Sequence, residues 1–133
     1  MRIILDTNVF ISGIFFSGPP SQILKAWGNQ RFQIALSRQI LDEYQRVAEN
    51  LSSKFPTVDI VPILELVTIH AQFVDTQGFD FNVCEDPDDD KFIECAVAGK
   101  CTTIISGDKH LLSLSGYQGI TILNSRNFVE KYL

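Results

Sequence analysis

The sequence predicts an α/β protein of three layers, α/β/α, in which helices cover both faces of a central parallel sheet. Short apolar runs typical of buried strands alternate along the chain with stretches of helical periodicity. Strands separated by helices need βαβ crossovers, and such crossovers place the strands parallel to one another. No internal repeat or low-complexity tract interrupts the 133 residues, so a single domain is expected over residues 1–133.

The predicted elements begin and end at residues suited to those positions. Ser37 is a good N-cap, Pro87 suits a first helical position, Gly99 ends a helix, and Ser125 caps the last one. The predicted strands are residues 2–6, 32–36, 102–106 and 120–123. The predicted helices are, approximately, residues 22–28, 38–51, 59–70, 87–98 and 126–132. The segment that follows the third helix, residues 71–74, fits either a strand or a helix end.

Composition excludes several classes of protein. Hydrophobic residues make up 45% of the chain, which is enough for a buried core and excludes intrinsic disorder. The longest uncharged run, residues 7–24, contains Ser, Gly, Pro and Gln residues that exclude a membrane span. Asp6 interrupts the N-terminal apolar run, so no signal peptide is expected. Cys84, Cys95 and Cys101 form no CxxC pair, and we expect free thiols in a cytoplasmic protein.

The net charge of −5 excludes a protein that coats nucleic acid by charge alone. It is compatible with a nucleic-acid enzyme, because a few carboxylates reserved for a divalent metal account for the whole deficit. Seven of the sixteen acids lie between Asp80 and Glu94. A calcium loop of the EF-hand type starting at Asp86 is excluded, since Lys91 and Val97 stand where that loop needs Gly and Glu.

Three acids are expected at one edge of the sheet. Asp6 ends the first predicted strand, and Asp108 follows a later strand after one glycine. Ligands of parallel sheets bind outside the carboxyl ends of the strands, where both acids would stand. In the helix after Ser37, a rotation of about 100° per residue puts Glu43 at the border of the apolar stripe and Asp42 in solvent.

A fourth acid is expected on the inner face of the helix that starts near Pro87. Asp89 stands three residues before Phe92, on the stripe that faces the core. An inward-facing carboxylate needs a partner, because the burial of a lone charge is expensive. A helix N-terminus stabilises one carboxylate, whereas a divalent cation satisfies several together. Asp90 remains the alternative to Asp89, because consecutive acids allow a shift of one residue.

The candidate site is therefore a set of carboxylates without a His or Cys cluster. Its members are Asp6, Glu43, Asp89 or Asp90, and Asp108. Hard oxygen ligands of this kind select Mg²⁺ or Mn²⁺ over zinc. The reaction that most needs such a site is phosphodiester hydrolysis, in which the metal activates water and neutralises charge on the attacked phosphate.

Three segments, in this order, resemble the motifs of PIN-domain nucleases. They are Leu5-Asp6-Thr7-Asn8-Val9-Phe10, Asp86-Pro87-Asp88-Asp89-Asp90-Lys91-Phe92 and Ser106-Gly107-Asp108-Lys109, with Ser37 and Glu43 between the first two. The resemblance covers essentially the whole chain and is greatest to the branch described as toxins of toxin–antitoxin systems. It implies a PIN-like three-layer fold and an Mg²⁺- or Mn²⁺-dependent endoribonuclease that acts mainly on single-stranded RNA.

The resemblance also implies roles for individual residues. The positions that match the family's metal-binding acids are Asp6, Glu43, Asp89 and Asp108, with Asp90 as the alternative to Asp89. Asn8 and Ser106 match polar positions that hold those acids or water molecules by hydrogen bonds. His110 departs from the pattern, because this branch more often has an acid there. A second metal ion would then be held more weakly.

Other residues have candidate roles in binding. Lys91, Lys109 and His110 flank the acids and are candidate contacts to RNA phosphates. The apolar stretch 9–16 suits an interface in a homodimer or with an antitoxin protein. Two functions stay open on the sequence: a ribonuclease, and a non-catalytic metal-binding module that docks RNA or a protein partner.

Overall fold

The computed structural model describes all 133 residues and contains one five-stranded sheet in which every pairing is parallel. The strand order is β3-β2-β1-β4-β5. The strands are β1 (Arg2–Leu5), β2 (Gln33–Leu36), β3 (Gln72–Phe73), β4 (Thr103–Ile105) and β5 (Thr121–Leu123). The chain builds the sheet outward from β1 to β3 and then returns to β4 on the other side of β1. The order of the strands therefore reverses between β1 and β4, where α/β sheets bind ligands.

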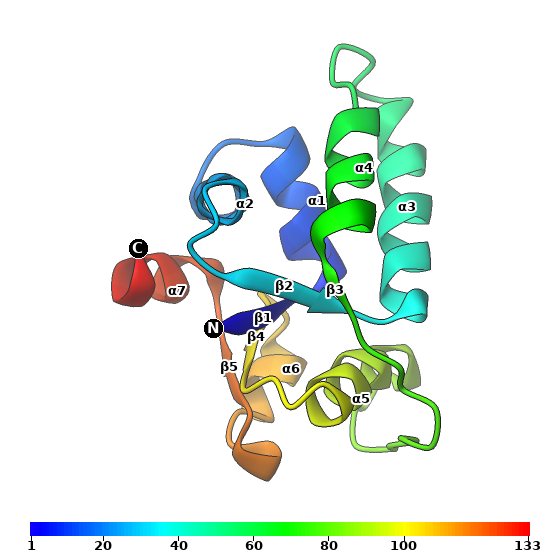
Figure 1. The fold of residues 1–133 in the computed structure, drawn as a ribbon, viewed down its shortest axis with the longest axis vertical. Helices are drawn as coiled ribbons and strands as arrows, with labels where there is room; N and C mark the ends of the chain where they lie inside the picture. Colours follow the sequence, from blue (N-terminus) through cyan, green and yellow to red (C-terminus); the bar gives the residue numbers. More distant parts are fainter.

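Helices lie on both sides of this sheet, which confirms the predicted three-layer α/β/α class. They are α1 (Thr7–Phe15), α2 (Pro19–Gly28), α3 (Arg38–Ser52), α4 (Val61–His70), α5 (Asp90–Ala98), α6 (Lys109–Ser113) and α7 (Ser125–Tyr132), with short 3₁₀ turns at η1 (Pro87–Asp89) and η2 (Tyr117–Gly119). Figure 1 shows α1 to α4 on one side and α5 and α6 on the other. No helix is both long enough and apolar enough to cross a bilayer.

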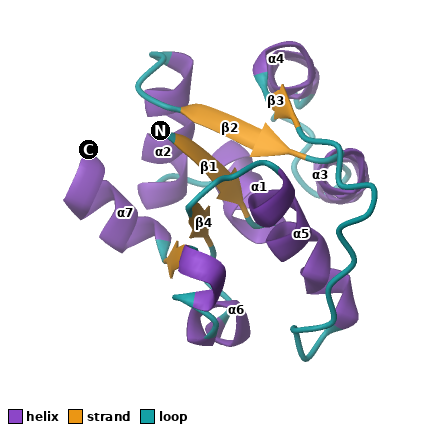
Figure 2. Cartoon of the chain, turned by 60° about the horizontal axis from the view of Figure 1, so that its bottom comes forward, coloured by secondary structure: helices purple, strands orange, loops and turns teal.

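The central strands are apolar on both faces because each face is covered. Ile3, Ile4 and Leu5 of β1 are fully buried, as are Ile104 and Ile105 of β4. The register pairs Leu5 with Ile105, so the two strands end at the same level. The residues that follow these strands therefore emerge side by side at the carboxyl edge of the sheet. Figure 2 shows α5 near the arrowhead end of β1 and α3 near that of β2.

Helix α3 is fixed to the end of β1 by a buried tyrosine. Tyr44 is fully buried, stacks on Phe10 of α1 with ring centroids 4.2 Å apart, and donates a hydrogen bond from its hydroxyl to the carbonyl of Leu5. Burial raises the pKa of Tyr44 well above its usual value, so this hydroxyl keeps its proton. The neighbouring residue on the helix, Glu43, is thereby held close to the carboxyl edge of β1.

The segment 9–16 forms most of helix α1, which the sequence analysis did not predict. Val9, Phe10 and Ile11 are buried in the core, so this part of the stretch is not an exposed partner surface. The helix follows β1 without a loop, since the amides of Val9 and Phe10 donate to the carbonyl of Asp6. Gly13, which interrupts the apolar pattern, lets α1 approach α2: a Cβ there would lie 2.8 Å from the Pro20 carbonyl oxygen.

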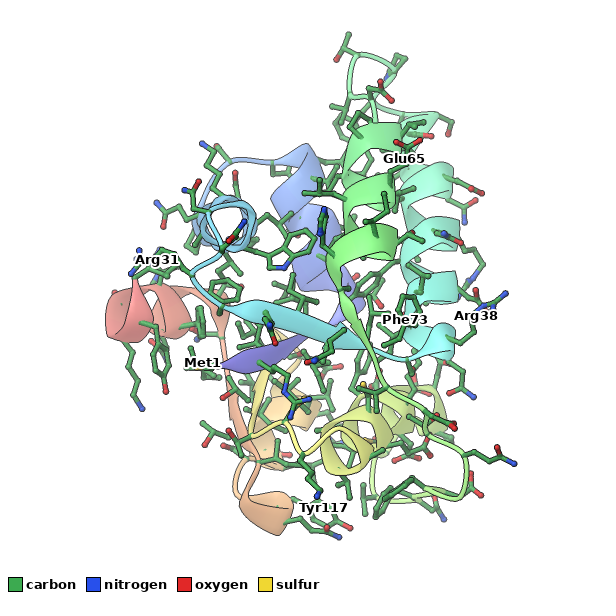
Figure 3. All side chains as sticks on the ribbon, viewed as in Figure 1. Met1, Arg31, Arg38, Glu65, Phe73 and Tyr117 are labelled. Atoms are coloured by element: carbon green, nitrogen blue, oxygen red, sulfur yellow. The ribbon has the colours of Figure 1, made fainter.

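Three other details refine the predicted elements. The undecided segment 71–74 contains the edge strand β3, where Phe73 is exposed (Figure 3). Pro87 begins a 3₁₀ turn, and the regular helix α5 starts only at Asp90. The short helix α6 was not expected; the Asp108 side chain caps it by accepting from the amide of His110 at 2.8 Å.

Candidate active site

One serine connects the two acids that follow β1 and β4. The Ser106 hydroxyl donates to Oδ2 of Asp6 at 2.6 Å and accepts from the Asp108 amide at 3.0 Å. Ser106 is fully buried and Asp6 is 7% exposed, whereas Asp108 lies at the surface. Ser106 therefore orients the Asp6 carboxylate and the backbone of Asp108 together, at the point where the strand order reverses.

Asp6 carries a buried charge that no cationic side chain of the protein offsets. None of the ion pairs in the structure includes Asp6. Burial raises the pKa of Asp6, and the negative charges of Asp108 and Glu43 raise it further, while the hydrogen bond from Ser106 opposes this change. A cation supplied from outside the chain would stabilise a carboxylate in this position.

Asp89, the last residue of η1, lies in the same electrostatic field. Burial raises its pKa from 3.8 to about 6, with further contributions from the charges of Asp6, Asp108 and Asp86. The Asp89 carboxylate accepts no hydrogen bond and forms no ion pair within the protein. We call Asp6, Asp89 and Asp108 the uncompensated group, because like charges act on one another here and none of the three forms an ion pair; the charge of Lys91 only partly offsets the effect on Asp89.

Asp90 has a different environment, although it is adjacent to Asp89. It is 5% exposed, and its Oδ1 accepts from the amides of Val83 at 3.1 Å and Cys84 at 2.9 Å. One oxygen of Asp90 is therefore committed to holding the loop before η1. The two candidates that the sequence left open thus differ: Asp89 faces like charges, and Asp90 anchors a loop through one oxygen.

Glu43 is neutralised by a lysine of α5. Its side chain is 16% exposed, and its Oε2 forms an ion pair with the ammonium of Lys91, which is 8% exposed. The same ammonium contacts Asp88 at Oδ2 (3.0 Å) and at its backbone carbonyl (2.8 Å). We call Glu43, Asp88, Asp90 and Lys91 the compensated group. Lys91 is turned inward, so it does not occupy the surface position that the predicted RNA contact requires.

Lys91 remains charged in this setting. Burial alone would lower the pKa of its ammonium, but the hydrogen bonds and charges of Glu43 and Asp88 outweigh burial, and the pKa of Lys91 is raised. The sequence analysis placed Lys91 next to the acids without predicting this pairing. The only sequence signal was its spacing of three residues from Asp88, which puts the two on one face of a helical turn.

Two clefts flank the acids. One, of about 540 Å³, has no hydrophobic lining residue and is bordered by Glu85, Asp86, Asp89, Asp108, Lys109 and His110. The other, of about 640 Å³, lies between α3 and α5; its lining includes Glu43, Arg46, Asn82, Asp90 and Lys91. His110 contacts the Glu85 carboxylate through Nε2, and Lys109 and Asn8 are exposed. Lys109 and His110 thus have the exposure that contact with a phosphate requires.

The donor set fits a hard divalent cation in its chemistry. All the candidate ligands are carboxylate oxygens, and in the uncompensated group none is paired with a cation. In their present rotamers no three His, Cys, Asp or Glu side chains form a ready-made ligand group. Binding of an ion therefore requires rotation of at least some of these side chains, which the exposure of Asp108 permits.

A parallel α/β sheet with carboxylates gathered at its switch point defines a class of proteins suited to metal-assisted chemistry on phosphates. A family model described as the PIN domain matches residues 2–110, a range that includes every acid discussed above. The chain belongs to the PIN-domain family, a nuclease superfamily whose members generally use divalent metals. It is also similar to the uncharacterized protein MJ1680 of Methanocaldococcus jannaschii, with 31% identity over 121 residues that cover 86% of this chain and 75% of that protein.

Proposed function

We propose that the protein is a metal-dependent endoribonuclease that hydrolyses phosphodiester bonds of single-stranded RNA. One observation carries the proposal. In this member of a nuclease family, the carboxylates of Asp6, Asp89 and Asp108 range from buried to exposed, and none of them forms an ion pair within the protein. Mg²⁺ or Mn²⁺ would bind to this group. Glu43 and Asp90 border it, and in each residue one carboxylate oxygen is engaged within the protein and the other is not.

The residues around the metal position have distinct tasks in this mechanism. When bound, a divalent ion neutralises charge on the attacked phosphate and lowers the pKa of water. Ser106 orients Asp6 through its hydroxyl and so sets the direction of the least mobile ligand. Lys109 and His110, exposed beside Asp108, contact the phosphates of the RNA on either side of the scissile bond. Asn8, exposed at the start of α1, holds a water molecule at the site.

The substrate is an anion and the site is acidic, so binding of RNA depends on the metal. The net charge of −5 provides no general attraction for a polyanion. The family resemblance implies products with 5′-phosphate and 3′-hydroxyl ends. We expect RNA affinity and cleavage to be lost together when the divalent ion is removed with EDTA.

We further propose that the protein acts in the cytoplasm as the toxin of a toxin–antitoxin pair. The resemblance of its motifs to the toxin branch supports this, and its three cysteines are free and buried, as suits a reducing compartment. Production of the wild-type protein in a bacterial host should arrest growth, and Asp6→Asn should abolish the arrest. Unchanged growth with soluble, active wild-type protein would contradict the toxin role and leave the ribonuclease proposal intact.

The ribonuclease proposal is tested by incubating the protein with mixed single-stranded RNAs in Mn²⁺, Mg²⁺ or EDTA. We expect internal cleavage only with a divalent ion, and a loss of about 10²–10³-fold in rate for Asp6→Asn. Glu49→Gln is the matched control, because Glu49 is an exposed acid of α3 that borders neither cleft and forms no ion pair. If the wild type binds RNA but never cleaves it with Mn²⁺, the protein is a non-catalytic docking module.

A further inference from the structure

Lys91 is the only lysine of the chain that is buried. A lysine ammonium has three donor protons, and the structure gives Lys91 three acceptors: Oε2 of Glu43, Oδ2 of Asp88 and the backbone carbonyl of Asp88. The ammonium also lies 5.3 Å from the ring centroid of Phe92. These contacts join α3 to the turn η1 and the start of α5. The cation is therefore locked in one place, at the border of the acidic site.

The acceptors of Lys91 are of the chemical types that also bind a hard metal ion. Glu43 and Asp88 supply carboxylate oxygens from two separate elements, and Asp88 adds a backbone carbonyl, which are also the ligand types of Mg²⁺ and Mn²⁺. Asp90, whose Oδ1 is engaged by amides, lines the same cleft as Glu43 and Lys91. Without the ammonium, Glu43 and Asp88 would have no ion-pair partner, and Arg46 would be the remaining cation that lines this cleft.

We infer that Lys91 is a positioning residue that occupies the place of a second divalent ion, so that the site binds one exchangeable metal. Its ammonium holds one oxygen of Glu43 and directs that carboxylate towards the uncompensated group. The inference rests on the proposed function, because it concerns the metal content of that same site. The ammonium of Lys91 then supplies the positive charge that a second ion would bring to the part of the site next to α3.

The test is the stoichiometry of Mn²⁺ binding at neutral pH, followed through the electron paramagnetic resonance signal of free aqueous Mn²⁺. We expect one bound ion per wild-type chain. Lys91→Met removes the internal cation and should create a second site, so that two ions bind, the second at least tenfold more tightly than any second ion on the wild type. Adding Glu43→Gln to Lys91→Met should return the count to one.

Two further variants separate this role from a general effect of charge or of folding. Lys91→Arg keeps a cation in place and should bind one ion, as the wild type does. Lys109→Met removes a positive charge that is also next to an acid of the site but is exposed, and its stoichiometry should stay at one. Circular dichroism of each variant establishes that it is folded. If Lys91→Met does not fold, the number of Mn²⁺ ions bound by the wild type and by Lys91→Arg still tests the inference.

The outcomes distinguish the inference from the function on which it rests. Two Mn²⁺ ions on the wild type, together with RNA cleavage, would overturn the role of Lys91 and leave the ribonuclease intact. One ion on both the wild type and a folded Lys91→Met, with unchanged affinity, would overturn it as well. A wild type that binds no Mn²⁺ and cleaves no RNA would overturn the proposed function itself.

Discussion

The uncompensated group and the compensated group lie side by side and each contain three carboxylates, but only the compensated group includes a cation, Lys91. Asp6 and Asp89 have raised pKa values, first because of burial and then because of neighbouring negative charges. Glu43 and Asp88 instead share the ammonium of Lys91. A buried carboxylate needs hydrogen bonds or a counter-charge. In the compensated group the chain supplies both, through backbone amides and Lys91. In the uncompensated group no ion pair is present, and a cation from solution would supply the charge.

This difference shows where the protein gives up stability. In the compensated group, the ion pairs of Lys91 and the hydrogen bonds that Asp90 accepts from backbone amides stabilise the carboxylates without a metal ion. In the uncompensated group, the metal-free state carries mutual repulsion that a divalent ion relieves. Affinity for the ion is therefore linked to the instability of the metal-free site.

Substitutions of Asp89 and Asp90 give the sharpest test of the difference between the two groups. Asp89→Asn should lower the rate of RNA cleavage and the affinity for Mn²⁺ by about 10²-fold or more, since it removes a charge that only the metal balances. The same change should stabilise the metal-free protein at neutral pH. Titration with Mn²⁺, a cleavage assay and urea unfolding measure these effects.

Asp90→Ala should instead affect the stability of the metal-free protein more than its affinity for Mn²⁺. It leaves the amides of Val83 and Cys84 without an acceptor, and we expect a loss of about 1–3 kcal/mol in the free energy of unfolding. If Asp90→Asn, which retains an acceptor oxygen, abolishes Mn²⁺ binding while Asp89→Asn does not, the second oxygen of Asp90 is the ligand and the division between the groups fails at this position.

Ser106→Ala tests whether the uncompensated group depends on its orientation. The change removes the donor to Asp6 and the acceptor of the Asp108 amide. We expect Mn²⁺ affinity to fall about 10–100-fold, the range found when groups that orient metal ligands are removed. Ser106→Thr, which keeps the hydroxyl, is the control. An unchanged affinity in Ser106→Ala would mean that packing alone orients Asp6.

The pH dependence of stability follows from the raised pKa of Asp89. Because its pKa is about 6 in the folded protein and 3.8 in the unfolded chain, its contribution to stability is complete below pH 3.8 and is lost as the pH rises through 6. Relative to the wild type, metal-free Asp89→Asn should gain about 1 kcal/mol between pH 4 and pH 7, after allowance for solvent screening.

Urea unfolding at both pH values measures this change in the difference between the two proteins. Mn²⁺ competes with the same proton, so its affinity for the wild type should fall about fivefold as the pH is lowered from 6 to 5. A difference between Asp89→Asn and the wild type that does not vary with pH would show that Asp89 is not held among like charges.

The smallest effect is expected at Arg38, which Figure 3 shows on the outer side of α3 and which pairs with the exposed Asp42. Arg38→Ala should change the free energy of unfolding by no more than about 0.5 kcal/mol, since the pair lies in solvent at a spacing of four residues. Cleavage of RNA should be unaffected. A large loss of stability or of cleavage in Arg38→Ala would show that Arg38 also contributes to the compensated group.

The strands and the longer helices could be predicted because their signals are local. Apolar runs identified four of the five strands, and the prolines at the start of α2 and the Ser37 N-cap of α3 located those helix starts. Helix α5 begins three residues after the predicted Pro87, and Asn124, not the predicted Ser125, caps α7.

Helix α1 was missed because its apolar side chains, interrupted by Gly13, lack an amphipathic pattern; Val9, Phe10 and Ile11 are all buried between elements that only the fold brings together. Helix α6, at five residues, is too short for periodicity to show.

The candidate site was only partly accessible to the same reasoning. The positions of Asp6 and Asp108 followed from the rule that strand ends meet at one edge, and that of Glu43 from helical periodicity. Their role as metal ligands remains a prediction. The pairing of Lys91 with Glu43 was missed, because the two residues are 48 positions apart in the sequence, on helices whose approach depends on the packed fold.

The amino-acid sequence by itself determined the α/β class and the acidic residue types of the candidate site, from which a hard divalent cation is predicted, since these depend on local pattern and on ligand chemistry. The tertiary structure alone decided which of these acids receive a positive charge from the chain and which do not. The pairing of a charge depends on distance and burial across separate elements, and neither quantity is encoded by spacing along the chain.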